Sequence, residues 1–322
     1  MALFEVEHLK KHFPVYDGFF KRQVGAFKAV NDVSFSIEAG ETFGLVGESG
    51  CGKTTVGKSV LRLIEPTAGV VRLDGLDITA MNKEQLRQQR QKMQIIFQDP
   101  YSALNPRMNV RSLISEPLLE HKLLEKNKTV INDRVAEILK KVGLNPQDMH
   151  KYPHEFSGGQ RQRIMIARAL ALHPKLIVCD EPVSALDVSV QAQILNLMQD
   201  LQDEYGISYL FIAHGMPVVQ HISKRIGVMY LGNLVEVADS DEIFYHAAHP
   251  YTKALMASIP NPDPDQPNDF NVVRGEVPNL IDPPPGCLFS NRCPYCTEEC
   301  RKSRPELKEI APGHQVACHC VK

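Results

Sequence analysis

The run Gly47-Glu48-Ser49-Gly50-Cys51-Gly52-Lys53-Thr54-Thr55 carries the clearest chemistry in the chain. It fits the pattern G-x-x-x-x-G-K-[ST], in which glycines let successive backbone N–H groups face phosphate oxygens. Lys53 is then in reach of the β- and γ-phosphates of a nucleotide, and the Thr54 hydroxyl can ligate Mg²⁺. These residues therefore predict a nucleotide-binding loop.

A second candidate pair, Asp180 and Glu181, follows the apolar run 176–179. A carboxylate at the C-terminal end of a buried strand is well placed to hold Mg²⁺, directly or through water. Glu181 can then polarise an attacking water as a general base. An Asp-Glu pair at a strand end can instead cap a helix. The phosphate loop elsewhere in the chain favours the metal and base roles.

A third candidate is Ser157-Gly158-Gly159-Gln160, which opens a helix. Ser157 is a natural N-cap, and the two glycines leave N–H groups bare at the positive end of the helix dipole. The plain alternative is a capped helix without a ligand. One nucleotide cannot easily use two anion sites of one chain, so this site is predicted to serve a nucleotide bound by another subunit.

The surrounding pattern predicts the elements that position these residues. A buried strand over 42–46 precedes the phosphate loop, and a helix over 56–64 follows it. Alternation and apolar runs predict further strands, and periodicity of about 3.6 residues predicts helices over 131–142 and 164–172. The predicted further strands are 3–9, 29–37, 70–73, 95–97, 176–179 and 209–213, and a loop with Phe13, Tyr16, Phe19, Phe20 and Phe27 is expected between the first two.

Composition excludes several functional classes. The net charge of −2 gives no basic field of the kind that nucleic acid attracts. No apolar run approaches the ~20 residues of a membrane-spanning helix, and the first residues lack the layout of a signal peptide. A cytosolic chain without a nucleic-acid partner is therefore expected.

Ser157-Gly158-Gly159-Gln160, followed by a strand that ends in Asp180-Glu181, resembles the ATP-binding subunit of an ABC transporter. The other motifs of that family occur in order. Gln98 resembles the Q-loop glutamine, which senses Mg²⁺ and the membrane partner. Ser184-Ala185-Leu186-Asp187 resembles the D-loop, which crosses the dimer interface, and His214 resembles the switch histidine that contacts the γ-phosphate.

The resemblance covers residues 3–258 and implies an α/β fold. It implies a P-loop NTPase (RecA-like) core with an antiparallel β subdomain and a helical subdomain. We expect an ATP-binding domain over 1–259 with its helical insert at about 92–170, in line with the usual size of domains. A Pro-rich linker is expected over 260–285 and a small Cys-rich module over 286–322.

The resemblance also implies roles for single residues. Glu181, His214 and Gln98 are expected to be catalytic, and Thr54, Gln98 and Asp180 to bind Mg²⁺. Phe13 is expected to stack on adenine, with Phe27 as the alternative. The family usually has Asp after the switch histidine, whereas this chain has Gly215, so the orientation of His214 depends on other groups. The nucleotide-binding residues are expected to be Phe13, Gly47, Glu48, Ser49, Gly50, Cys51, Gly52, Lys53, Thr54, Thr55, Gln98, Ser157, Gly158, Gly159, Gln160, Asp180 and Asp187.

Two longer segments, 97–107 and 249–255, resemble the di- and oligopeptide importer subfamily, and most closely its "F" ATPase subunit. This implies an ATP hydrolase on the cytoplasmic face of the membrane. The expected partners are a second, different ATPase subunit, two transmembrane permease subunits and an extracytoplasmic substrate-binding protein. Importers of nickel, glutathione or other peptide-like solutes are the alternatives. A soluble ABC ATPase is less favoured, since such proteins usually have two fused cassettes or coiled-coil inserts.

Six of the eight cysteines lie between Cys287 and Cys320. In a reducing cytosol such a cluster favours metal over disulfides, and four thiolates can hold zinc or an iron–sulfur cluster. Only Cys293 and Cys296 have the C-x2-C spacing of a zinc ribbon. The resemblance implies a [4Fe–4S] cluster on Cys287, Cys293, Cys300 and Cys318, with zinc as the alternative. A metal-sensing regulator is a rival function, but it leaves the ATP motifs without a role.

Overall fold

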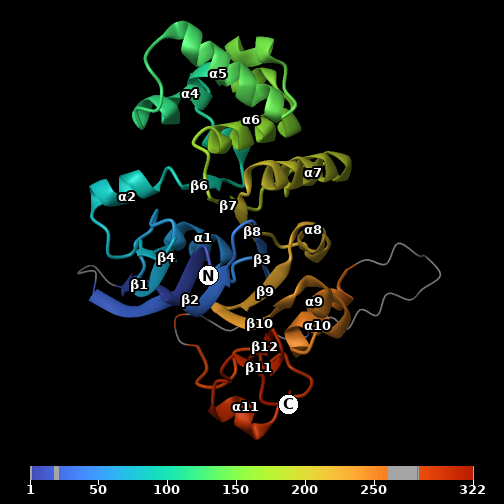
Figure 1. The fold of residues 1–322 in the computed structure, drawn as a ribbon. Coiled ribbons are helices and arrows are strands. Elements are labelled where there is room, and N and C mark those ends of the chain that lie inside the picture. Colours follow the sequence, from blue (N-terminus) through green and yellow to red (C-terminus); the bar gives the residue numbers. More distant parts are fainter. Residues whose placement is uncertain (1, 18–21, 260–280, 282, 322) are drawn as a thin grey trace, which may run out of the picture. The chain divides into compact units, whose positions relative to one another are not determined.

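The computed structural model describes residues 2–17, 22–259, 281 and 283–321. The chain divides into two compact units (Figure 1). The first contains residues 1–37, 42–79 and 212–322, and the second contains residues 38–41 and 80–211. Most of the expected linker at 260–285 lies outside the described residues.

The first unit contains an antiparallel sheet with strand order β2-β1-β4-β5. The prediction of a loop between residues 9 and 29 is wrong for the described part, because β1 and β2 run on and pair beyond the predicted ends. Several register shifts interrupt this pairing, and such irregularities hide the two-residue alternation from a sequence reading. The strands are β1 (Phe4–Asp17), β2 (Arg22–Ile37), β4 (Ala68–Leu73) and β5 (Leu76–Asp77).

The first unit also contains the row of hydrogen-bonded strands β11-β12-β10-β9-β3. Strand β3 is buried throughout and pairs in parallel with β9, so it carries the phosphate loop out of a rigid core. The remaining elements of the unit are β3 (Thr42–Val46), α1 (Lys53–Val60), α8 (Met216–Ile222), β9 (Arg225–Tyr230), β10 (Asn233–Asp239), α9 (Ser240–His246), α10 (Pro250–Ala257), α11 (Glu298–Lys302), β11 (Lys308–Ala311) and β12 (His314–Val316).

The second unit combines the strands β8-β7-β6 with helices. Strands β6 and β7 pair in parallel, and β7 is buried throughout, as its apolar sequence predicts. Helices α4, α5 and α6 pack against one another (Figure 1). Its elements are α2 (Lys83–Gln89), β6 (Met93–Ile96), α3 (Pro100–Ala103), α4 (Val110–Glu120), α5 (Lys128–Lys141), η1 (Pro146–His150), η2 (Pro153–Glu155), α6 (Gly158–Leu170), β7 (Leu176–Asp180), α7 (Val188–Tyr205) and β8 (Ser208–Ile212).

The predicted apolar face of α5 is confirmed, since Ile131, Val135, Ile138 and Leu139 are all buried. Helix α1 is shorter than predicted and ends at Val60. Among the described residues, no helix combines the length and the apolar character that crossing a membrane requires.

A buried carboxylate joins the C-terminal strands to the rest of the first unit. Strand β12 pairs with β10, and Glu236 of β10 is fully buried. Its carboxylate accepts the backbone N–H groups of Ala248 at 2.6 Å and His249 at 3.0 Å, and Nε2 of His314 lies 2.8 Å from Oε1. Each carboxylate oxygen therefore has a donor, as burial of a charge requires.

We predict that Glu236→Gln lowers the free energy of unfolding by about 2–4 kcal/mol. The amide of Gln replaces one accepting oxygen with an NH₂ group, which then faces either a backbone N–H group or His314 and leaves a buried donor without an acceptor. Denaturant unfolding of the full chain measures this. Glu298→Gln is the matched control, because Glu298 pairs with Lys302 on the exposed surface. Equal unfolding midpoints for the two variants would contradict the structural role of Glu236.

Candidate nucleotide site

Two glycines bring the phosphate loop against neighbouring strands. A Cβ on Gly47 would lie 2.1 Å from the carbonyl oxygen of Met229, and one on Gly52 would lie 2.1 Å from that of Ala29. Both glycines also have positive φ, of 153° and 107°. No other residue fits at either position without moving backbone. The loop is thus held against β9 and β2 at both of its ends.

Lys53 begins helix α1 and is 4% exposed. Its Nζ donates to the carbonyl oxygens of Gly47 at 2.7 Å and Glu48 at 2.9 Å, and lies 3.7 Å from Sγ of Cys51. The ammonium therefore stays inside the curl of the loop, where phosphate oxygens are able to reach it. Burial raises the pKa of the Cys51 thiol, which keeps that side chain neutral.

Glu48 is held from two directions by residues far along the chain. Its backbone N–H donates to the Tyr251 hydroxyl at 2.8 Å. Its carboxylate accepts hydrogen bonds from both terminal nitrogens of Arg292, each at 3.0 Å. Sequence reasoning missed both partners. Tyr251 lies in the segment 249–255 that marked the subfamily, but nothing local indicated what it contacts.

The two candidate adenine-stacking residues, Phe13 and Phe27, are direct cross-strand partners on β1 and β2. Opposed residues of an antiparallel pair share a face, and each of the two residues is 36% exposed. Nζ of Lys11 lies 4.9 Å from the centroid of the Phe13 ring. Both rings thus belong to one aromatic surface, and stacking by either stays a prediction.

In the second unit, Gln98 and Glu181 meet. Nε2 of Gln98 donates to Oε2 of Glu181 at 2.8 Å. Glu181 follows Asp180 at the end of β7 and has a φ of 49°, a left-handed conformation that is rare for a residue with a side chain. Asp180 is buried. Such strained residues concentrate at functional sites.

Ser157 and Gln160 form a capping box at the start of α6. The Gln160 N–H donates to Oγ of Ser157 at 3.4 Å, and the Ser157 N–H donates to Oε1 of Gln160 at 3.0 Å. A Cβ on Gly159 would lie 2.5 Å from the Val190 side chain. The glycine therefore lets α6 approach α7, whose N-cap residue is Asp187. The start of α6 therefore lies against the side chains of Leu186 and Val190 in the same unit.

His214 is exposed and precedes α8 in the first unit. Gly215 is the N-cap residue of α8 and provides no side-chain cap. The Asp that the resemblance implies after residue 214 is thus replaced by a residue without a side chain, and the switch role of His214 stays a prediction.

The C-terminal cysteines are neighbours, but their arrangement does not support the predicted metal site. Burial raises the pKa of Cys287 to about 11, with smaller contributions from Cys300, Cys318 and Cys293. Nevertheless, no group of three or more His, Cys, Asp or Glu side chains within residues 2–17, 22–259, 281 and 283–321 is arranged to hold a metal ion. The predicted cluster, and zinc as its alternative, find no support in this geometry.

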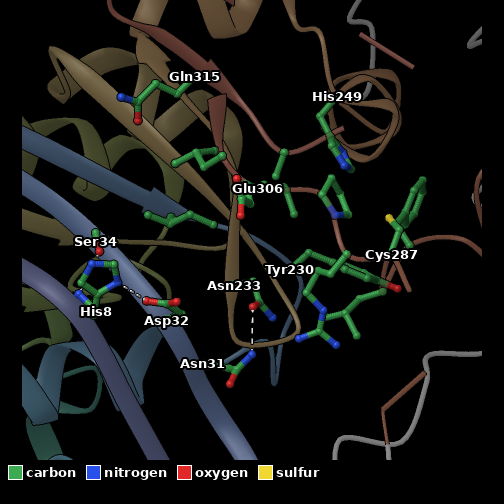
Figure 2. A pocket seen from close by; sticks show the side chains of 18 of the residues that line it. His8, Asn31, Asp32, Ser34, Tyr230, Asn233, His249, Cys287, Glu306 and Gln315 are labelled. Carbon is green, nitrogen blue, oxygen red and sulfur yellow. Dashed lines mark hydrogen bonds and ion pairs between the residues drawn. The ribbon is translucent and has the colours of Figure 1, made fainter. Parts of the chain in front are cut away.

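A pocket of about 750 Å³ lies in the first unit, apart from the phosphate loop. Figure 2 shows Tyr230, His249 and Cys287 at one side of it and His8 with Asp32 at the other. No residue of 47–55 lines it. Residues of β1 and β2 and of the C-terminal region line this pocket together, so it is not the predicted nucleotide site.

Comparison with known proteins agrees with the motifs. Residues 30–184 match the family model "ABC transporter", and residues 235–300 match "Oligopeptide/dipeptide transporter, C-terminal region". The chain is 49% identical over 321 residues to the oligopeptide transport ATP-binding protein AppF of Bacillus subtilis strain 168, covering 99% of this chain and 97% of that protein. It is 50% identical over 318 residues to the probable peptide ABC transporter ATP-binding protein y4tS of Sinorhizobium fredii, covering 99% and 90%.

Solved structures give the same family. A dimeric, post-hydrolysis structure of the ATP-binding cassette MJ0796 bound to ADP and Pi has a TM-score of 0.65 and 26% identity. The similarity covers 74% of this chain and 98% of that chain. The chain therefore belongs to the ABC transporter ATP-binding proteins, in the group that has the oligopeptide/dipeptide transporter C-terminal region.

Proposed function

We propose that this chain is the ATP-binding and hydrolysing subunit of an importer for di- or oligopeptides. The observation that carries the proposal is the phosphate loop, with Lys53 held inside it by the carbonyl groups of Gly47 and Glu48. Relatives named as oligopeptide or peptide transport ATP-binding proteins support the substrate class, since they match nearly the full length of the chain.

In this proposal Lys53 and the loop N–H groups bind the β- and γ-phosphates. Thr54, Asp180 and Gln98 hold Mg²⁺, which neutralises charge on the phosphates when it is bound. Glu181 takes a proton from the attacking water as general base. The Gln98 amide, 2.8 Å from the Glu181 carboxylate, orients that base. His214 contacts the γ-phosphate, and Phe13 or Phe27 stacks on adenine.

The proposal further assigns Ser157–Gln160 to the nucleotide of a second cassette. The dimeric state of the similar cassette MJ0796 supports this arrangement. We propose that the partner is a second, different ATPase subunit, and that two transmembrane permease subunits and an extracytoplasmic substrate-binding protein complete the importer. The chain would then lie at the cytoplasmic face of the membrane as a peripheral subunit.

If Glu181 is the general base, Glu181→Gln will lower the ATP turnover of the assembled transporter by roughly 10²–10⁴-fold and leave ATP binding intact, because the amide takes up no proton. Turnover and binding are measured on the same preparation. Lys53→Ala is the comparison, since it should weaken binding itself. Wild-type turnover by Glu181→Gln would remove the assigned role.

We also predict that the isolated subunit hydrolyses ATP poorly, because the phosphate loop and Ser157–Gln160 are assigned to different nucleotides. Hydrolysis should rise sharply when the second ATPase and the permease subunits are added. Activity is measured against protein concentration. A dilute monomer with full, concentration-independent activity would contradict the shared site.

Finally, we propose a [4Fe–4S] cluster on Cys287, Cys293, Cys300 and Cys318, supported by the number and proximity of the thiols. Their described positions are not those of metal ligands, so binding requires the thiols to turn toward one centre. Protein purified without oxygen should then be brown and contain iron and sulfide. Cys296→Ser, which alters a thiol outside this set, should keep the colour. Colourless protein with stoichiometric zinc would favour zinc instead, and metal-free protein would exclude both.

A further inference from the structure

The phosphate loop contains an acidic residue that a distant arginine neutralises. Arg292 precedes Cys293 in the C-terminal region, and both of its terminal nitrogens donate to the Glu48 carboxylate, each at 3.0 Å. The arginine side chain is only 8% exposed. A planar guanidinium that donates to both carboxylate oxygens forms one of the stronger ion pairs found in proteins.

Aromatic packing fixes the segment that holds this arginine. Phe289 packs against Tyr230 and Tyr251, with ring centroids 5.4 Å and 5.6 Å apart. The Arg292 N–H donates to the carbonyl oxygen of Phe289 at 2.9 Å, and the hydroxyl of Tyr230 accepts from the guanidinium at 3.4 Å. Tyr251 in turn accepts the N–H of Glu48. Residues from the C-terminal part of the chain thus bind both the backbone of Glu48, through Tyr251, and its side chain, through Arg292.

The charge of Glu48 has a consequence for nucleotide binding. Nucleotide phosphates are negative, and a carboxylate within the loop repels them. At the effective dielectric constant of about 20 that applies near a protein surface, such repulsion reaches across several ångströms. The positive charge of Arg292 lies directly against the Glu48 carboxylate and offsets its negative charge. The field at the loop therefore stays positive, owing to its N–H groups, Lys53 and the dipole of α1.

We propose that Arg292 is the counter-ion of the phosphate loop, so that the C-terminal region sets the affinity of this subunit for nucleotide phosphates. Arg292 is a positioning residue that acts through Glu48 and touches no reacting atom. Neither the phosphate loop nor the C-terminal region is then an independent module. A structural change in the segment 287–293 would therefore alter nucleotide affinity through the ion pair between Arg292 and Glu48.

Nucleotide affinity of the purified full-length chain tests this proposal. With Mg²⁺ present, the probes are a non-hydrolysable ATP analogue and ADP, so the result does not depend on catalysis. Arg292→Met should weaken binding of the ATP analogue about tenfold, since an uncompensated charge remains beside the phosphates. The loss should be smaller for ADP, which carries one negative charge fewer. Arg292→Lys, which keeps the charge, should bind within about threefold of wild type.

The double variant Arg292→Met/Glu48→Gln should recover most of the lost affinity, because the repelling carboxylate is gone. Arg301→Met is the control, since it removes an exposed arginine from α11 of the same region. Wild-type affinity in Arg292→Met, an equal loss for both nucleotides, or no recovery in the double variant would each overturn the proposal. Lys53→Ala, by losing binding, verifies that the assay reports this loop. An unfolded fraction raises the apparent dissociation constants of both nucleotides by the same factor, so circular dichroism at the assay temperature must show that each variant is folded.

Discussion

The phosphate loop is possible only where backbone approaches backbone more closely than a Cβ allows. Gly47 lies against the Met229 carbonyl group and Gly52 against that of Ala29. The Gly232 N–H, in the turn between β9 and β10, donates to the carbonyl oxygen of Cys51 at 2.8 Å. The conformation of the loop therefore depends on β2, which precedes it in the sequence, and on β9 and the turn after it, which follow it by about 180 residues. Because Lys53 is bonded to the loop, these contacts also determine the position of its ammonium group.

The contact between β9 and the phosphate loop also brings the C-terminal region next to the loop. Strand β9 ends in Tyr230, and the ring of Tyr230 packs against Tyr251 and Phe289. These three rings provide a dry surface next to the loop, and burial raises the pKa of Tyr251, which keeps its hydroxyl protonated beside Glu48. Elements that follow the core in sequence thereby complete the loop's surroundings.

Local pattern was enough to predict the phosphate loop, the buried strand β7 and the capped start of α6, because each depends on residues within a few positions. It failed for Tyr251 and Arg292, which lie 203 and 244 positions from Glu48. No periodicity encodes such a contact. The extended β1 and β2 were also missed, because their register shifts break the alternation on which strand prediction depends.

The pairing of β12 with β10 has a further meaning for the architecture of the chain. A strand at the border of a sheet displays unused N–H and C=O groups, which invite association with other chains. In this protein Gln315 and Val316 of β12 pair with Val237 and Glu236, so β12 covers this side of β10. A fragment that stops after α10 would leave β10 bare there, and would strip the buried Glu236 of His314. The C-terminal region therefore covers one side of β10 with its own strands and moves the border of the sheet to the short strand β11.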